Sequence, residues 1–277
     1  MPKISVIMSV YNAREEWLRE AIESILNQTF SDFEFIIIND GSKNNSEEVI
    51  LSYKDERIKY VKQENQGLAK SLNNGMKIAQ GEFIARMDSD DISLPERFEK
   101  QVYFLNRNKD VSVLGTWFEF FPEKRIMRHP EKISFFNLLA SCCIGHPTVM
   151  WRRQDFERYD LKYDETFKAA QDYDLWSRAI RYVKFANLQE VLLKYRWHNE
   201  SISQSKAEIQ QSNANKVKQS MLDFLTNNVD TQNKIKDVVF NTVKYSFFEY
   251  IFSVKNSADY KIITVLGMHI KLKRKKK

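Results

Sequence analysis

The sequence has few cysteines and no internal repeat, and both shortages narrow the kind of protein it encodes. Only two of its 277 residues are cysteines, Cys142 and Cys143, and they are adjacent. Neighbouring cysteines rarely pair with each other and lack the spacing of a metal-binding cluster, which favours a reduced, cytosolic compartment. No long Gly/Ser-rich linker separates the chain into independent parts.

Long hydrophobic runs are also missing. None approaches the ~20 apolar residues that a membrane-spanning helix needs. The N-terminus has one lysine and a short apolar stretch, followed by the polar residues 11–14. This pattern predicts a first β-strand and not a signal peptide. We therefore expect a cytoplasmic protein.

The positive charge is confined to one end of the chain. The formal net charge is +6, and six basic residues lie within the last seven positions, 271–277. The remaining chain is formally neutral, so we expect no broad surface for nucleic acid. Hydrophobic residues make up 43% and charged residues 29%, as in globular proteins. The length allows one α/β domain and an appendage.

Strand-like and helix-like segments alternate over the first 110 residues or so. Predicted strands lie at 3–10, 34–38, about 58–60 and 82–87, and predicted helices begin near Asn12, Gly67 and Pro95. Asn12 and Glu15 are close to a capping-box pattern. Such alternation predicts an α/β fold with a mostly parallel central sheet flanked by helices.

The remaining chain is more mixed. We predict strands at 111–118, 147–151 and 190–197, and helices near 133–141 and 173–182. From about 204 onward the pattern favours a polar helical extension, with an apolar stripe between Ile235 and Phe252. The stripe could pack on its own domain or on a second subunit.

Three polar clusters follow predicted strands. They are residues 9–12, 39–42 and 88–91. Ligands of open α/β sheets bind at the carboxyl ends of the strands. The three clusters are therefore expected to line one crevice.

Asp88 and Asp90 are candidate metal ligands. Two carboxylates two residues apart, in a turn after a buried strand, can both face one Mg²⁺ or Mn²⁺, because these cations prefer oxygen ligands. Such a cation would neutralise a diphosphate leaving group. The alternative is a turn-forming loop in which Asp91 or Ser93 caps the next helix.

Asp40, at the end of the second strand, is a candidate for recognising a nucleotide base. Its carboxylate could accept a hydrogen bond from the ring N–H of uracil or from the pairing edge of guanine. The alternative is an Asx-turn stabiliser. Tyr11, at the end of the first strand, could stack on the base or simply pack there.

Asp172 and His198 complete the candidate residues. Asp172 lies at the start of a helix whose residues Leu175, Trp176, Ala179 and Ile180 give it a buried face. A carboxylate fixed there could accept the proton of an acceptor hydroxyl, or it could cap the helix or compensate its dipole, as we favour for Asp174. His198, near an arginine, could meet a metal or a diphosphate, or be a surface or packing residue.

Taken together, these segments resemble the family 2 glycosyltransferases, whose fold is called GT-A. The matches are SVIMSVYN at 5–12, INDGS at 38–42, ENQGLAKSLNNG at 64–75, ARMDSDDISLPERFEKQ at 85–101, GHPTVMWR at 145–152, QDYDLWSR at 171–178 and YRWHNESIS at 195–203. Each motif alone is weak to moderate, but their order and spacing are specific. The resemblance covers about residues 3–205.

The resemblance implies roles for the matching residues. Asp172 corresponds to the catalytic base and Asp40 to the carboxylate that recognises the base of the nucleotide. Asp88 and Asp90 correspond to the DxD pair, with Asp90 the more direct ligand of Mn²⁺ or Mg²⁺ and His198 near the metal or diphosphate. We also expect donor contacts from Ser9 and Tyr11. One position departs from the family, because Gln171 stands where a glutamate precedes the base, which puts in doubt any step that needs a second acid.

The implied function is inverting transfer of a sugar from a nucleotide-diphosphate sugar, favoured to be a UDP-sugar, to an acceptor hydroxyl on a growing glycan. Bacterial members that build surface polysaccharides resemble this chain in having a short apolar stretch before a basic end, here 262–270 and 271–277. The basic tail predicts peripheral binding to the cytoplasmic face of the inner membrane and a lipid-linked glycan acceptor, unless it is a solvated terminus.

We expect a catalytic domain at 1–205 and a helical extension with the basic tail at 206–277. Two other functions remain as alternatives. The first is a non-catalytic module that binds nucleotide sugars, which Gln171 keeps open. The second is a sugar nucleotidyltransferase, although residues 10–20 lack the Gly-rich, basic phosphate-binding segment that such enzymes usually carry.

Overall fold

The computed structural model describes residues 1–198, 207–237, 252–256, 260–265 and 268–273. The chain divides into two compact units, Met1–Val217 and Lys218–Lys277. The domain boundary predicted after residue 205 stays a prediction.

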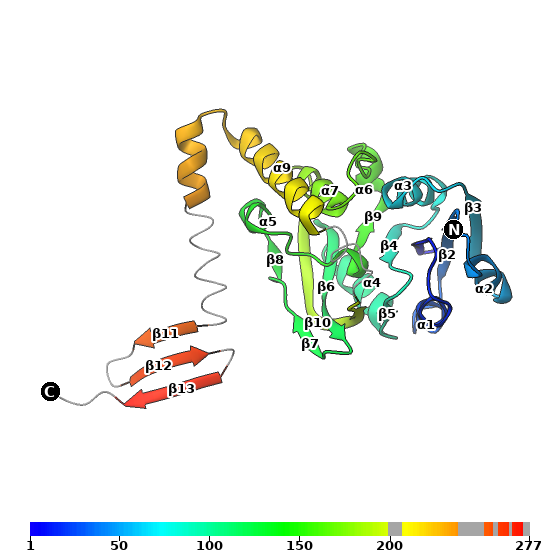
Figure 1. Cartoon of the computed structure of the whole chain (residues 1–277), viewed down its shortest axis with the longest axis horizontal. Helices are drawn as coiled ribbons and strands as arrows, with labels where there is room; N and C mark the ends of the chain where they lie inside the picture. Colours follow the sequence, from blue (N-terminus) through cyan, green and yellow to red (C-terminus); the bar gives the residue numbers. More distant parts are fainter. Residues whose placement is uncertain (199–206, 238–251, 257–259, 266–267, 274–277) are drawn as a thin grey trace. The chain divides into compact units, whose positions relative to one another are not determined.

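The first elements alternate as the sequence predicts. They are β1 (Ile4–Val10), α1 (Glu15–Leu26), β2 (Phe33–Asp40), α2 (Ser46–Ser52), β3 (Ile58–Gln63), α3 (Leu68–Ile78) and β4 (Phe83–Met87). Strands β3, β2, β1 and β4 lie side by side in that order and all pair in parallel. The α/β prediction is confirmed, and because these four strands are parallel their carboxyl ends lie at one edge of the sheet. Figure 1 labels β2, β3 and β4 together with the neighbouring helices α1, α2 and α3.

The elements that follow are β5 (Ile92–Ser93), α4 (Arg97–Arg107), β6 (Val111–Phe121), β7 (Arg125–Met127), β8 (Lys132–Ile133), α5 (Phe135–Ala140), a 3₁₀ turn (His146–Thr148), β9 (Met150–Arg152), α6 (Arg153–Arg158), α7 (Gln171–Ala179), β10 (Lys184–Arg196) and α9 (Ala207–Leu225). In the described residues they extend the sheet to ten strands. Strand β9 enters antiparallel between β4 and β6, whereas β6 and β10 are parallel. The sheet is therefore mixed beyond β4.

Both faces of β1 are covered by helices. Val6, Met8 and Val10 belong to one apolar cluster with the buried residues of α1. On the other face α3 lies so close that a Cβ added to Gly75 would come within 2.6 Å of the Ile7 side chain. Because successive strand residues point to opposite faces, both covered by helices, most residues of β1 are apolar.

A buried polar contact fixes the pairing of β1 and β2 near their amino ends. Ser5 Oγ donates a hydrogen bond to Glu34 Oε1 at 2.5 Å, and these two residues are direct partners in the sheet. Glu34 also pairs with Lys59 of β3. The backbone N–H groups of Gln80 and Gly81, just before β4, donate to Ser5 Oγ. One polar group of contacts thus joins all four parallel strands.

The structure corrects two local predictions. Asn12 does not cap α1, whose N-cap is Arg14, because Asn12 has a left-handed backbone (φ +50°) and its Oδ1 accepts a hydrogen bond from Lys43 N at 2.8 Å. Its short amide tolerates that conformation and links the loops after β1 and β2. Neither Asp91 nor Ser93 caps α4, which begins after Glu96.

The extension is not purely helical. Beyond α9 the chain is helical over 229–237, but Phe252–Asn256, Tyr260–Val265 and Met268–Lys273 form three antiparallel strands, β11, β12 and β13. Consecutive β-branched residues within 262–265 favour a strand over a helix. The apolar stripe predicted from 235 to 252 lies mostly outside the described residues.

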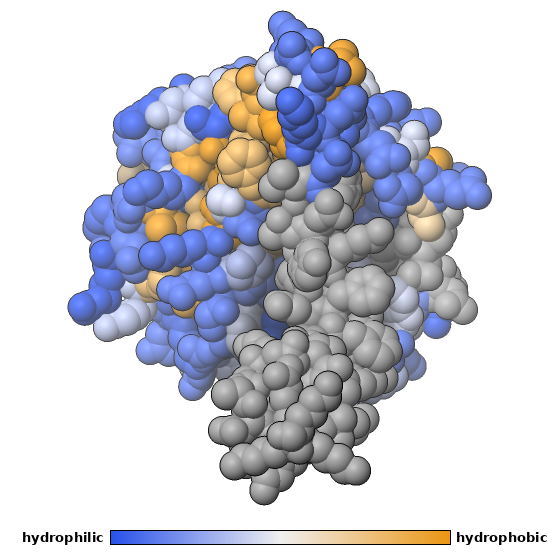
Figure 2. Space-filling model, turned by 90° about the vertical axis from the view of Figure 1, so that its left-hand side faces the viewer, coloured by the Kyte–Doolittle hydropathy of each residue, from blue (hydrophilic) through white to orange (hydrophobic). Residues whose placement is uncertain are grey.

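Large apolar side chains that are well exposed in the first unit are spread along the chain, as at Tyr103, Phe136 and Tyr182. In the view of Figure 2 the described surface is mostly hydrophilic, with apolar residues showing in several separate patches. Across the described ranges, no helix is both long and apolar enough to cross a membrane.

Candidate active site

The carboxyl ends of β1, β2 and β4 meet at one cavity, which we call the large groove. Its volume is about 740 Å³. The lining includes Ser9, Tyr11, Asp40, Asp88, Asp90 and His198. The structure therefore brings together six of the seven predicted site residues, and the seventh, Asp172, lines an adjoining cavity.

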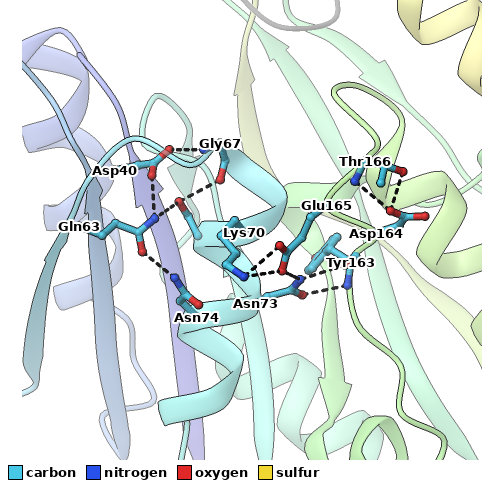
Figure 3. A network of polar contacts seen from close by, with 11 residues as sticks. Asp40, Gln63, Gly67, Lys70, Asn73, Asn74, Tyr163, Asp164, Glu165 and Thr166 are labelled. Carbon is cyan, nitrogen blue, oxygen red and sulfur yellow. Dashed lines mark hydrogen bonds and ion pairs between the residues drawn. The ribbon is translucent and has the colours of Figure 1, made fainter.

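Asp40 is buried and holds the loop between β3 and α3 (Figure 3). Its Oδ1 accepts hydrogen bonds from Gln63 Nε2 at 2.7 Å and from Gln66 N at 2.9 Å. Its Oδ2 accepts from Gly67 N at 2.9 Å and from Asn65 Nδ2 at 3.3 Å. These four bonds use the acceptor capacity of a carboxylate. Asp40 is therefore not a local Asx turn but the anchor of a loop that borders the groove.

A second set of polar contacts in Figure 3 joins α3 to the loop after α6. Lys70 pairs with Glu165 at 3.0 Å, and Asn73 donates to the same carboxylate at 3.0 Å. Asn73 also exchanges hydrogen bonds with the backbone of Tyr163. Glu165 and its neighbours Phe167 and Lys168 line the groove. The segment 163–165 beside the groove is thus held by α3, whereas the loop 63–67 is held by Asp40.

The turn after β4 presents two half-exposed carboxylates to the groove. Asp88 forms an ion pair with Arg86, and Asp90 Oδ2 lies 2.8 Å from His198 Nε2. Burial raises the pKa of Asp88, with Arg86 opposing the shift and the negative charge of Asp90 adding to it. The predicted pair therefore lies in one turn with a cation on one side and an imidazole on the other.

The end of β10 clamps this turn from behind. Arg196 Nε donates to the backbone carbonyl of Asp90 at 2.7 Å, and Arg196 N donates to Asp91 Oδ1 at 2.8 Å. The Arg196 guanidinium also pairs with Glu20 of α1. Burial raises the pKa of Asp91 well above its usual range, and the charges of Asp90 and Asp88 contribute. Arg196 therefore uses its guanidinium and backbone N–H for contacts within the protein, and these contacts hold the turn in place.

Arg86 is a residue of the site that sequence reasoning missed. It is a charged residue in an otherwise apolar strand, and its side chain is fully buried. Among the described residues, Nε and Nη1 have no hydrogen-bond partner, while Nη2 contacts Asp88. A buried guanidinium is rare unless it is paired. Its proximity in sequence to Asp88 was the one available signal.

His198 is held against an aromatic ring. The ring centroids of His198 and Trp17 are 4.6 Å apart, and the imidazole side chain is 17% exposed. Trp17, on α1, also lies under the guanidinium groups of Arg14 and Arg196. His198 is therefore neither a free surface residue nor part of the apolar core, and its Nε2 is directed at Asp90.

These residues offer two carboxylates and an imidazole to a divalent cation. Within the described ranges, no group of three or more His, Cys, Asp or Glu side chains is arranged to hold a metal by itself. Both carboxylates face the groove, and Mg²⁺ commonly completes its shell with water and substrate phosphates. The donor set therefore fits a cation that arrives with a phosphorylated ligand.

Asp172 lies in a second cavity of about 320 Å³, which we call the small pocket. It is the second residue of α7, whose N-cap is Ala170 with a left-handed backbone (φ +59°) and no side-chain capping bond. Burial raises the pKa of Asp172, and the negative charge of Asp88 acts in the same direction. Asp172 is therefore not the cap of the helix. The N-cap position is held by Ala170, whose left-handed backbone is strained for a residue other than glycine.

The two cavities meet at the carboxylate turn. Both are lined by Leu68, Asp88, Asp90 and Gln171. Asp172 faces the small pocket and Tyr11 and Asp40 the large groove. Asp174 is engaged elsewhere, in an ion pair with Arg178 at 2.7 Å. The arrangement offers two adjoining cavities that share one turn of carboxylates, with Asp172 in the smaller of them.

The fold is that of the GT-A class, with a groove at the carboxyl ends of its parallel strands. The sequence model described as "Glycosyl transferase family 2" matches residues 5–183, which is more than half of the chain. The chain therefore belongs to glycosyltransferase family 2, as predicted, and it is a glycosyltransferase enzyme by that membership.

Relatives named as glycosyltransferases support this assignment. An uncharacterised glycosyltransferase of Methanocaldococcus jannaschii is 41% identical over 210 residues, covering 72% of each chain. Another from Haemophilus influenzae is 32% identical over 258 residues, covering 84% of this chain and 77% of the relative.

Solved structures with the same fold include that of TarS 1–349 from S. aureus in complex with UDP-GlcNAc. It has a TM-score of 0.72 and 20% sequence identity, and the match covers 88% of this chain and 73% of that one. At this identity the likeness shows the fold alone, which confirms the predicted GT-A class.

Proposed function

We propose that this protein is an inverting, metal-dependent glycosyltransferase that uses a UDP-sugar. The observation that carries the proposal is the meeting of two cavities at Asp88 and Asp90, with Asp172 on one side. A donor in the large groove and an acceptor in the small pocket would have their reacting atoms at this junction. The complex of TarS with UDP-GlcNAc supports a uridine donor for this fold.

The reaction requires one base and one good leaving group. The acceptor hydroxyl attacks the anomeric carbon from the face opposite the nucleotide, while the bond between that carbon and the diphosphate oxygen breaks. Asp172 accepts the hydroxyl proton, and the bonding electrons leave with UDP. A positioned base of this kind contributes ~10²–10⁴ in rate. A single displacement of this type inverts the configuration.

We assign donor binding to the large groove. Ser9 and Tyr11 would contact the nucleoside, and Asp40 would shape the base site, either directly or through the loop 63–67 that it anchors. Asp90, Asp88 and His198 would hold Mn²⁺ or Mg²⁺. When bound, the cation would neutralise charge on the departing diphosphate.

The acceptor and the location follow from weaker features. We propose a glycan or lipid-linked glycan acceptor in surface polysaccharide synthesis at the cytoplasmic face of the membrane, with residues 271–277 attracted to anionic lipid. Each basic side chain near such a surface adds ~1 kcal/mol. The test is co-sedimentation with anionic vesicles at low salt, where deletion of 271–277 should release the protein. Unchanged sedimentation would reject this mechanism.

The test of the catalytic proposal is nucleotide release from UDP-, GDP- and dTDP-sugars with Mn²⁺ or Mg²⁺. We expect release from one donor that EDTA abolishes and added metal restores. Asp90→Ala and Asp172→Asn should both lose transfer, and the anomeric configuration of the product should be opposite to that of the donor. Asp110→Asn, at the exposed start of β6, serves as the matched control. Binding of UDP without release from any donor would favour a non-catalytic module.

A further inference from the structure

The two cavities differ in charge, and the difference bears on the chemistry of the acceptor. The large groove is lined by the cations Arg14 and Lys168 as well as by four carboxylates, and the two cations can pair with a diphosphate. The small pocket is lined by Asp88, Asp90 and Asp172, and none of the described residues that line it is a lysine or arginine. An anionic ligand group in the small pocket would therefore find no cationic side chain to pair with, and beyond the proposed metal ligands Asp88 and Asp90 it would face Asp172.

Aromatic side chains form one wall of the small pocket. Phe118 and Phe120 lie two residues apart on β6 and so point to the same face of the strand. Tyr195 of β10 is the direct partner of Phe120 in the sheet. The ring of Trp197 meets the edge of Phe120 at 5.4 Å between centroids. Phe118 and Phe120 are buried, whereas Tyr195 and Trp197 are half-buried at the surface of this wall.

Trp197 is held rigidly. Its backbone N–H donates to Phe121 O at 3.0 Å, which continues the pairing of β6 and β10 by one residue. Its two neighbours, Arg196 and His198, both contact the carboxylate turn. The backbone of Trp197 is therefore placed relative to Asp90, and its ring packs against Phe120. A rigid aromatic surface gives contact area at little loss of conformational entropy.

We propose that the small pocket binds the uncharged sugar ring at the end of the acceptor, with Trp197 packed against the ring and its attacking hydroxyl directed at Asp172. This inference rests on the proposed transferase function and specifies its acceptor. A sugar ring combines apolar C–H surface with hydroxyl groups, which matches a wall of aromatics facing polar side chains. His146, Gln171 and Gln210 supply the polar side.

Charged acceptors fit the pocket less well. A uronic acid, a sugar phosphate or a polyol phosphate would bring an anion toward Asp172, and no lysine or arginine among the described residues that line the pocket could pair with it. Arg86 does not line the pocket and is already paired with Asp88. The volume of about 320 Å³ also limits the deep part of the site to the end of an acceptor.

The test compares acceptors by their acceleration of metal-dependent UDP release and by product formation. The panel pairs octyl glycosides of neutral hexoses with the matching uronic acids and 6-phosphates, and includes a polyol phosphate. We expect kcat/KM at least tenfold higher for one neutral glycoside than for its charged counterparts. Acceleration by the charged or polyol phosphate acceptors instead, or by no neutral glycoside, would overturn the inference.

Variants test the tryptophan. Trp197→Ala should raise the KM for the neutral acceptor about tenfold and change kcat less, and Trp197→Phe should be intermediate. Tyr182→Ala removes an exposed aromatic that lines neither cavity and should leave both constants unchanged. UDP binding, measured by titration, reports whether each variant is folded. An unchanged KM in a folded Trp197→Ala protein would reject the role of this ring.

The two proposals fail separately. If no donor is turned over in any condition, the transferase function itself is wrong. If metal-dependent release of UDP occurs but only charged acceptors are glycosylated, the transferase function stands and the acceptor inference is wrong.

Discussion

The four hydrogen bonds to Asp40 allow a quantitative test of its role. In Asp40→Asn one carboxylate oxygen becomes an NH₂ group, which cannot accept from a backbone N–H. Whichever way the amide lies, either Gln66 N or Gly67 N faces a donor, because these two groups bond to different oxygens at 2.9 Å. The side-chain amides of Gln63 and Asn65 can rotate to compensate, but the backbone cannot.

The expected magnitude follows from these contacts. A hydrogen bond to a charged group contributes ~1.5–3 kcal/mol, and a buried donor without a partner costs ~1–3 kcal/mol. We expect Asp40→Asn to lower the free energy of unfolding by about 3 kcal/mol. For a protein of this size that is roughly 6–12 °C in Tm, at ~2–4 °C per kcal/mol.

The assay is thermal unfolding with and without UDP. The matched control is Asp110→Asn, whose carboxylate forms an exposed ion pair with Lys184 and should change stability by less than ~1 kcal/mol. We also expect weaker UDP binding by Asp40→Asn, because the loop it anchors borders the large groove. A Tm within about 2 °C of wild type would refute the loop-anchoring argument.

Three further variants or conditions probe the site. Asn213→Ala removes the hydrogen bond from α9 to the carbonyl of Ala169 at 2.9 Å, just before α7, and should lower kcat severalfold with little change in the KM for the donor. Because burial raises the pKa of Asp172 and the base must be ionised, kcat should fall with decreasing pH at values above the ordinary aspartate pKa of ~3.9; a pH–rate profile whose acid limb lies below that value would contradict this. Gly41→Ala places a Cβ 2.6 Å from Asn65 N at a φ of +72° and should destabilise the protein by roughly 2 kcal/mol and weaken UDP binding, as thermal unfolding and titration would measure.

The parallel half of the fold could be predicted because its strands are buried on both faces. The mostly apolar residues of β1, β2 and β4 are visible in the sequence, and the polar residues at and after their ends mark the carboxyl edge. The expectation that these ends line one crevice agrees with the large groove, although the roles assigned to the residues stay predictions. Motif order then identified the family, which the comparisons confirm.

Contacts between distant segments could not be predicted in the same way. The antiparallel insertion of β9 depends on pairing with β4 across more than sixty residues and with β6 across more than thirty-five, which leaves no local pattern. The same holds for Arg196, whose bonds to the turn after β4 join residues 106 positions apart. The prediction that Asn12 caps a helix was wrong because helix caps and left-handed turns favour the same small polar side chains.

The contact between Ser5 and Glu34 has a consequence for how this enzyme can vary. It lies near the amino ends of the strands, whereas Ser9, Asp40 and the Asp88 turn lie at the opposite edge, a fixed number of residues away. Each residue adds ~3.3 Å to a strand and reverses the direction of the next side chain. A single insertion or deletion between the two edges would move a site residue out of reach and turn its neighbours toward the wrong face. Changes of length should therefore accumulate in the loops, while the spans from Ser5 to Ser9 and from Glu34 to Asp40 keep their residue count.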